Sequence, residues 1–246
     1  MGVHTMTAPH FRSWAVTHPG AKRKHNEDTY VDRPDLGIWA VADGAGGHAA
    51  GEVASGMLAE ALEAIPAGLS ASELLAEVRL AVERTHAALR DEAARRGPDV
   101  IVASTIVVML ARGEHFACLW AGDSRAYLLR DGMFRQITRD HSLVQELLEA
   151  GAIGPDEVEN HPRANVITRA VGADMDEFML DKVSDRLLPG DRFLLCSDGL
   201  CKTLPENELA TLLGSANGVS LQALIDAALA AQVSDNVTAV AVEFTG

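Results

Sequence analysis

The stretch Gly37-Ile38-Trp39-Ala40-Val41-Ala42-Asp43-Gly44-Ala45-Gly46-Gly47-His48 joins a short apolar run to an aspartate set among glycines. The apolar part is too short for an ordinary helix and is bounded by glycine, which is typical of a buried strand. Asp43 would then lie at the end of that strand, where the following glycines let the backbone turn because they have no Cβ. An acid in this position can reach a ligand or a metal ion from a rigid sheet. Because a single Asp-Gly pair more often marks only a turn, the pattern needs support elsewhere in the chain.

Other predicted strands place an aspartate in the same way. The apolar runs before Asp123 and Asp198 both end in an acid. A further strand, residues 236–244, begins just after Asp235, which suits an antiparallel neighbour that presents its acid at the same end of the sheet. Aspartates that met at one end would repel each other strongly in a dry site unless cations neutralised them. The repetition therefore predicts a carboxylate site for hard divalent metal ions.

Composition and charge exclude several classes of protein. A chain of 246 residues can bury one core, and we expect a single domain over residues 11–245 with residues 1–10 as a disordered end. The balance of 21 basic against 35 acidic residues gives a net charge of -14, which opposes a nucleic-acid or anionic-membrane partner. No run approaches the ~18 apolar residues of a transmembrane helix, and the first residues do not form a signal peptide. We expect a cytoplasmic monomer.

Apolar periodicity predicts runs of strands interrupted by two paired helical stretches. The predicted strands are residues 12–17, 29–32, 101–111, 115–121, 125–129, 133–137, 178–183, 192–197 and 236–244, and the predicted helices are residues 48–65, 71–96, 142–150, 206–213 and 221–231. Ser70 and Glu73 form a capping box at the start of the long helix 71–96. Strands grouped in this way favour antiparallel sheets with helices packed outside them, which is an α+β fold.

Five motifs follow one another along the chain. They are Arg23-x-x-Asn26-Glu27-Asp28, Asp43-Gly44-x-Gly46-Gly47-His48, Gly122-Asp123-Ser124-Arg125-Ala126-Tyr127, Ser197-Asp198-Gly199 and Ser234-Asp235-Asn236. In order and spacing they resemble the bacterial stand-alone branch of the PP2C-type (PPM) metal-dependent protein serine/threonine phosphatases, some of which are associated with type VI secretion. The resemblance covers residues 14–244. It implies a four-layer α/β/β/α fold, with a central antiparallel β-sandwich flanked by helix pairs and two or three Mn²⁺ or Mg²⁺ ions at one end.

The resemblance also implies the metal ligands. Asp43 would bridge two metal ions, the Gly44 carbonyl would bind one of them, and Asp198 and Asp235 would bind the other. Gly44 suits this role because its backbone must approach the ion closely. Asp123 resembles the acid that contributes to a third, weaker metal site. The alternative for Asp123 is a strand-end aspartate that bonds the backbone just after it.

Further residues would act around the metal ions. Arg23 would hold the substrate phosphate, because its planar guanidinium matches phosphate oxygens better than the point charge of a lysine does. Glu27 and Asp28 resemble acids that reach the ions through metal-bound waters, and the alternative is that they only orient the first strands. Arg125 also lies near the site in sequence, but we expect it to form a structural ion pair.

The chain departs from the family pattern at Ala45. Animal members have a histidine there, proposed as the general acid for the leaving group. A metal-bound water, His48 and His161 are other candidates for that role, and we expect that no histidine is required. Residues 140–172 correspond to the mobile flap of bacterial members, which bears on substrate choice, or else form a plain surface connection.

The resemblance implies an enzyme. A metal-activated water would hydrolyse phosphoserine and phosphothreonine on phosphorylated proteins, in opposition to a cognate serine/threonine kinase. The alternative is a low-activity phosphoprotein-binding regulatory module of the same fold, against which the intact set Asp43, Asp198 and Asp235 argues. A two-metal nuclease is disfavoured, because the chain is acidic and has no basic groove for a polyanion.

Overall fold

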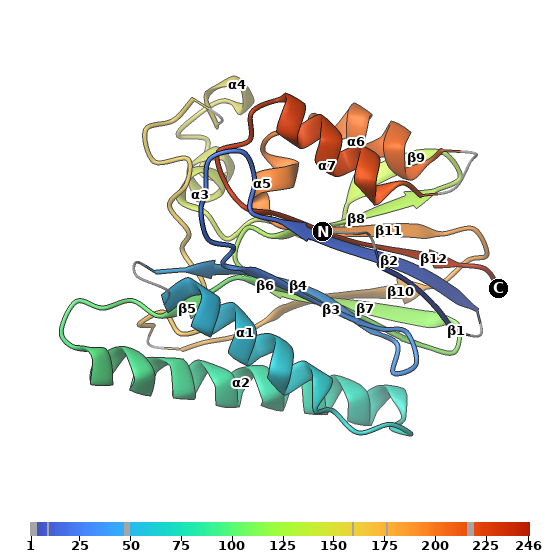
Figure 1. The fold of residues 1–246 in the computed structure, drawn as a ribbon, viewed down its shortest axis with the longest axis horizontal. Helices are drawn as coiled ribbons and strands as arrows, with labels where there is room; N and C mark the ends of the chain where they lie inside the picture. The colour runs from blue at the N-terminus through green and yellow to red at the C-terminus, as the bar shows by residue number, and fades with distance from the viewer. Residues whose placement is uncertain (1–3, 9, 47–49, 159, 176, 216–218) are drawn as a thin grey trace.

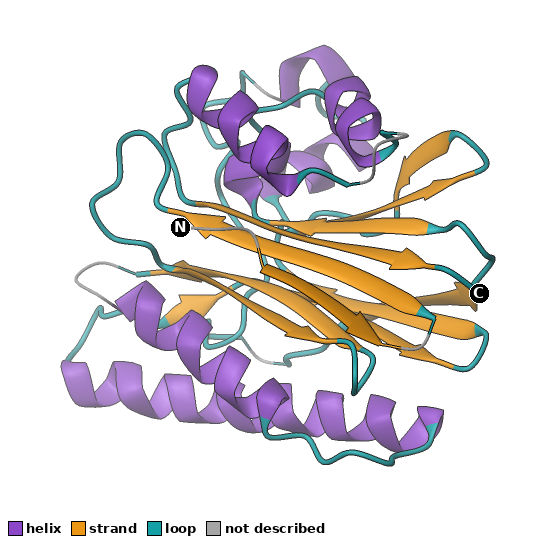
Figure 2. Ribbon diagram, turned by 45° about the vertical axis from the view of Figure 1, so that its right-hand side comes forward, coloured by secondary structure: helices purple, strands orange, loops and turns teal. Residues whose placement is uncertain are grey.

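Two antiparallel sheets form the centre of the molecule. The computed structural model describes the chain apart from residues 1–3, 9, 47–49, 159, 176 and 216–218. The sheets lie face to face, and helices cover the outer face of each (Figures 1 and 2). The order of layers is therefore helix, sheet, sheet, helix, which confirms the predicted α+β sandwich.

Each sheet draws its strands from distant parts of the sequence. The first sheet has the order β1 (His4–Ala8), β2 (Phe11–His18), β12 (Val237–Phe244), β11 (Arg192–Cys196), β8 (Arg125–Arg130) and β9 (Met133–Gln136). The second sheet has the order β10 (Asp181–Arg186), β7 (His115–Ala121), β6 (Ile106–Arg112), β4 (Ile38–Ala45) and β3 (Asp28–Arg33), and β5 (Ala103–Ser104) pairs with β4. The last strand, β12, lies between β2 and β11 in the middle of its sheet.

Strand β12 contributes to two layers of the core, one on each face of its sheet. Successive side chains of a strand point to opposite faces. Val240 and Val242 pack into the core between the two sheets, whereas Ala239 and Ala241 pack into the core beneath the outer helices. Every residue of β12 is buried as a result, which explains why the sequence there is an almost unbroken apolar run.

Helices cover the second sheet on one side and the first sheet on the other. Helices α1 (Ala50–Glu63) and α2 (Ala71–Arg96) lie against the second sheet, and α5 (Asp198–Cys201), α6 (Glu206–Leu213) and α7 (Leu221–Ala230) lie against the first (Figure 1). Among the helices that the structure describes, none is both long enough and apolar enough to span a membrane.

Helix α2 begins and ends where its sequence predicts. The Ser70 hydroxyl accepts a hydrogen bond from the Glu73 backbone N–H at 3.3 Å, and the Ser70 N–H donates to the Glu73 carboxylate at 2.8 Å, so the predicted capping box is confirmed. The apolar face of the helix, formed by Leu74, Val78, Val82 and Leu89, is buried against the second sheet. Local capping and amphipathic spacing together fix this element.

Residues 140–172 leave the sandwich and return to it at one end. They contain the short helices α3 (Leu143–Glu149) and α4 (Pro155–Val158), which lie to the left of the sheets in Figure 1. Two isolated bridges, Ser142 to Ile167 and Ser104 to Val171, fasten the segment to itself and to the sandwich.

The structure differs from the sequence-based predictions at the chain start and near β10. Residues 1–10 were expected to be disordered, but His4–Ala8 form β1, which pairs with β2 because that strand has a free edge. The strand predicted at residues 178–183 instead spans Asp181–Arg186, where pairing with β7 sets the register. The four-residue helix α5 was not predicted.

Candidate metal centre

Three of the acids predicted as metal ligands open into one cavity at the end of the sandwich. Asp43 lies at the end of β4, Asp198 begins α5 just after β11, and Asp235 stands before β12. The cavity has a volume of about 820 Å³, and these three acids line it together with Arg23 and Gly44. Further lining residues are Lys24, His25, Glu27, Ala45, Gly46, Glu52, Asn165 and Ile167.

The backbone of Asp43 is held in place by the neighbouring strands. Its carbonyl accepts hydrogen bonds from the Thr105 N–H at 2.8 Å and the Ser104 hydroxyl at 3.0 Å, and its N–H donates to the Thr105 hydroxyl at 3.2 Å. Burial raises the pKa of the Asp43 carboxyl well above its ordinary value, and the nearby carboxylates of Asp28 and Asp198 raise it further. The Asp43 carboxyl is therefore both desolvated and close to other acidic groups.

Gly44 marks a close approach between β4 and α1. A Cβ at this position would lie 2.1 Å from the Gly51 carbonyl oxygen and 2.7 Å from the Glu27 carbonyl oxygen. The Gly44 N–H also donates to the Glu27 carbonyl at 3.1 Å. Glycine is required here for space, and its backbone lines the cavity beside Asp43.

Asp28 connects the two sheets instead of lining the cavity. Its carboxylate accepts a hydrogen bond from the Ser197 hydroxyl at 2.7 Å, and the same hydroxyl accepts from the Thr238 N–H at 3.0 Å. Burial raises the pKa of Asp28 to about 7, while the hydrogen bond from Ser197 opposes that rise. Because Ser197 directly precedes Asp198, this contact helps to position a predicted metal ligand.

Asn236 organises the segment that carries Arg23. Its side-chain amide donates to the carbonyls of Pro19 at 3.0 Å and His25 at 2.9 Å, and its amide oxygen accepts from the Glu27 N–H at 2.9 Å. The sequence motif contained Asn236, but its role was not predicted. Its sequence signal was its place directly after Asp235 in the Ser234-Asp235-Asn236 motif, and the structure shows that its side chain is buried.

Arg23 contacts a predicted metal ligand in this structure. Its guanidinium donates to the Asp235 carboxylate at 2.8 Å, and both side chains are about half exposed. The other Asp235 oxygen accepts from the Asn236 N–H at 2.9 Å. Arg23 therefore lies at the edge of the cavity, within reach of a ligand that bound near Asp235.

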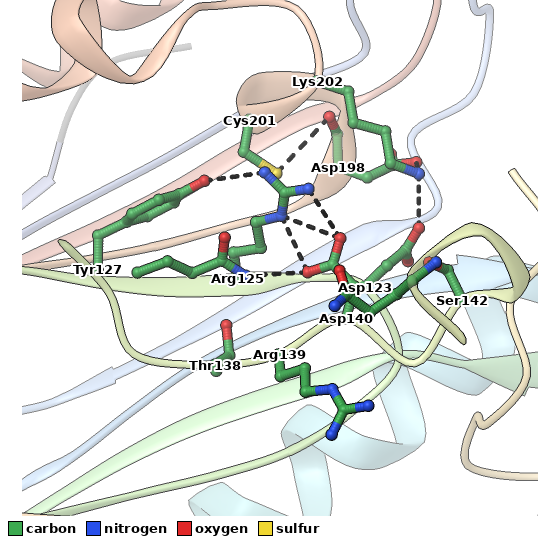
Figure 3. A network of polar contacts seen from close by, with 12 residues as sticks. Asp123, Arg125, Tyr127, Thr138, Arg139, Asp140, Ser142, Asp198, Cys201 and Lys202 are labelled. Carbon is green, nitrogen blue, oxygen red and sulfur yellow. Dashed lines mark hydrogen bonds and ion pairs between the residues drawn. The ribbon is translucent and has the colours of Figure 1, made fainter. Parts of the chain in front are cut away.

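Asp123 lies beside the cavity and is paired with a lysine that sequence analysis did not single out. Lys202 donates to the Asp123 carboxylate at 2.6 Å and to the Asp198 carboxylate at 3.0 Å (Figure 3). Burial and the charge of Asp198 raise the pKa of Asp123, and Lys202 opposes that rise. The only sequence signal for Lys202 was its position four residues after Asp198, one helical turn away.

Arg125 forms the structural ion pair that was predicted for it. Its guanidinium donates to both oxygens of Asp140, at distances of 2.8 to 3.1 Å, and also to the Tyr127 hydroxyl at 3.2 Å (Figure 3). Of the candidate histidines, His48 lies outside the described residues, as does Gly47 of the same motif. His161 accepts a hydrogen bond from the Arg163 N–H and does not line the cavity.

The donor set fits hard divalent ions. All the predicted ligands are oxygen donors, which suit Mg²⁺ and Mn²⁺. Within the described residues, no three His, Cys, Asp or Glu side chains are grouped closely enough to hold an ion unaided. In this structure Arg23 pairs with the Asp235 carboxylate, and Lys202 pairs with those of Asp198 and Asp123. Hard divalent ions such as Mg²⁺ commonly bind one or two carboxylates and keep several waters as their other ligands. Burial raises the pKa values of Asp28 and Asp43, and neighbouring carboxylates raise them further, so bound cations would relieve repulsion at this site.

A sandwich of this layering with an acidic, oxygen-rich cavity at one end is the architecture of a metal-dependent phosphatase. Residues 21–234 match the family model of protein phosphatase 2C, and the chain belongs to that family.

Similar proteins agree with this assignment over almost the whole chain. The serine/threonine phosphatase stp of Listeria monocytogenes is 35% identical over 236 residues, covering 92% of this chain and 93% of the relative. The structure of PppA, described as a key regulatory component of the type VI secretion system in Pseudomonas aeruginosa, superposes with a TM-score of 0.87 at 41% identity, covering 98% of this chain and 99% of that one.

A related structure contains the predicted kind of metal. The catalytic domain of the phosphatase PstP, in complex with two manganese ions, superposes with a TM-score of 0.85 at 34% identity. The match covers 96% of this chain and 99% of that one. The prediction of a metal-dependent protein serine/threonine phosphatase is confirmed at the level of the family.

Proposed function

We propose that this protein phosphatase hydrolyses phosphoserine and phosphothreonine on proteins with two Mn²⁺ or Mg²⁺ ions held by Asp43, Gly44, Asp198 and Asp235. The observation that carries the proposal is the single cavity into which all four residues open, from three separate parts of the chain. Its substrates would be the phosphoproteins made by a cognate serine/threonine kinase. A monomer acting in the cytoplasm is also part of our proposal.

Each residue would have a distinct task in the reaction. Bound divalent ions would neutralise the carboxylates and activate water for in-line attack on phosphorus. Thr105 fixes the Asp43 backbone through both its N–H and its carbonyl, which would hold the carboxylate in position to bind divalent ions. Glu27 lines the cavity at a position suited to contact through water, and Asp28 would act indirectly by holding Ser197.

Arg23 would bind the phosphate. Arg23 would exchange its contact with Asp235 for phosphate oxygens once a cation neutralises that carboxylate. We expect Arg23→Ala to raise KM for a phosphothreonine peptide by roughly 10- to 100-fold, with a smaller change in kcat, because a charge-assisted contact to the substrate is lost. Arg23→Lys should recover part of the loss. Initial-rate kinetics at saturating Mn²⁺ measure both effects.

Two controls make the Arg23 experiment specific. Arg135→Ala removes an exposed arginine outside the cavity and should leave KM unchanged. The Mn²⁺ affinity of Arg23→Ala, measured by calorimetry, should not fall, since Arg23 competes with the ion for Asp235. An unchanged KM would remove Arg23 from the substrate site.

Metal removal tests the proposed function itself. Dephosphorylation of a phosphothreonine peptide should be lost after treatment with EDTA and should return on adding Mn²⁺ or Mg²⁺. Phosphate release, followed with malachite green, measures this. Full activity in EDTA would refute the metal mechanism. Binding of the phosphopeptide without turnover at saturating Mn²⁺ would instead favour the regulatory module.

A further inference from the structure

Lys202 places a positive charge between two carboxylates at the side of the cavity. Its ammonium lies 2.6 Å from Asp123 Oδ2 and 3.0 Å from Asp198 Oδ2 (Figure 3). Asp198 is one of the proposed ligands of the two-ion centre. Asp123, whose residue is only 1% exposed, lies just after β7 and was predicted to contribute to a third ion.

The position of this ammonium is fixed by short-range structure. Lys202 is the C-cap residue of α5, and its backbone N–H donates to the Asp198 carbonyl at 2.8 Å, so the lysine follows Asp198 by one helical turn. On the other side, Ser124 holds the turn that carries Asp123, through a 2.7 Å hydrogen bond between its hydroxyl and that of Thr105. The contact therefore joins two well-anchored backbones.

An ammonium and a divalent ion cannot share this place. A Mg²⁺-like ion binds carboxylate oxygens at about 2.0 to 2.1 Å, so an ion shared by Asp123 and Asp198 would lie where the Lys202 ammonium now lies. Two cations a few ångströms apart in a partly buried site would also repel each other strongly. Either the lysine or the ion can occupy the space between these two acids.

We propose that Lys202 is a built-in cation that takes the place of a third divalent ion between Asp123 and Asp198. Lys202 contacts only Oδ2 of Asp123, and the other oxygen, Oδ1, is buried and has no hydrogen-bond partner within the described residues. If the lysine were removed, both oxygens of Asp123 would be available to bind an ion. The protein would then use two ions and a lysine where three ions would otherwise fit. This inference rests on the proposed two-ion centre, because it concerns how many ions that centre holds.

Counting bound manganese tests the inference without measuring activity. The protein is stripped with EDTA, dialysed against Mn²⁺ and analysed for metal content per chain, as wild type and as Lys202→Met, which keeps a long unbranched side chain without charge. We expect two ions in the wild type and three in Lys202→Met. Lys182→Met, at an exposed position on β10, should bind two ions, as should Lys202→Arg, which keeps the charge. In the double variant Lys202→Met/Asp123→Asn, the count should return to two.

Each outcome separates this inference from the proposed function. A wild type that binds no Mn²⁺ would refute the two-ion centre itself. A wild type with two ions together with a Lys202→Met variant that also binds two would refute only the role of Lys202. Should Lys202→Met fail to fold, anomalous scattering from manganese-soaked wild-type crystals decides the question. A manganese peak bonded to Asp123 would overturn the inference, and two peaks at Asp43, Asp198 and Asp235 with none at Asp123 would support it.

Discussion

Replacing Asp43 by asparagine should lower kcat/KM for a phosphothreonine peptide by on the order of 10³-fold, or about 4 kcal/mol of transition-state stabilisation. The proposed role of Asp43 is to bridge both ions, and asparagine offers only one neutral oxygen in place of a charged carboxylate. The hydrogen bonds of residue 43 to Thr105 and Ser104 involve its backbone, so they survive the substitution. We therefore expect a folded protein that has lost its metal centre.

The measurement pairs kinetics with metal binding. Steady-state rates give the loss in kcat/KM, and calorimetry with Mn²⁺ should show that at least one ion no longer binds. Asp131→Asn is the matched control, because it makes the same chemical change in an exposed hairpin turn where asparagine also tolerates the positive φ of 52°. Tight binding of two ions by Asp43→Asn would show that the bridging role is misassigned.

The metal-free protein should lose stability as pH rises from about 4 to about 7. In the folded protein, burial raises the pKa of Asp28 to about 7, whereas in the unfolded chain an aspartate has a pKa near 3.9. Between these values the folded state binds the proton and the unfolded state does not, so the free energy of unfolding falls as pH increases. The difference of about three pH units corresponds to roughly 4 kcal/mol. Asp43 contributes in the same direction.

The variant Asp28→Asn isolates this effect from other titrating groups. An asparagine oxygen can still accept the hydrogen bond from Ser197, but it does not ionise. Urea unfolding in EDTA at several pH values should show Asp28→Asn gaining stability over the wild type as pH rises, with no further gain above pH 7. Saturating Mn²⁺ should reduce the wild-type loss, because the ions neutralise the same carboxylates. A constant difference between the two proteins at all pH values would contradict the assignment.

Elements with strong local signals were predictable from the sequence. The capping box at Ser70 and the apolar stripe behind it located α2, and the apolar run in residues 115–121 located β7. The predicted start of the strand near β10 was wrong. Phe178 is of a residue type common in strands, but in the structure its ring stacks on His86 of α2 with ring centroids 4.4 Å apart. The strand itself begins only at Asp181, where pairing with Trp120 starts. Tertiary contact decided that boundary.

The acids of the candidate site could be predicted because each lies close to one end of a buried strand. The side chains that contact these acids could not be predicted from the sequence. Lys202 caps a helix that is too short to have a periodic pattern, and its contact with Asp123 joins positions 79 residues apart. Asn236 donates hydrogen bonds to backbone carbonyls of a loop near the chain start, and no local sequence pattern indicates which carbonyls those are. Spacing along the chain predicts ligands at strand ends, whereas the counter-charges between them depend on how the sheets stack.

The central position of β12 in the first sheet has a consequence for protein synthesis. Strand β2 and strand β11 are both made before β12, yet they meet only through it. Asp235 and Asn236 stand at its start, so the acidic cavity and the anchored loop around Arg23 can form only after β12 has been synthesised. A nascent chain that still lacks β12 therefore cannot form the proposed metal site.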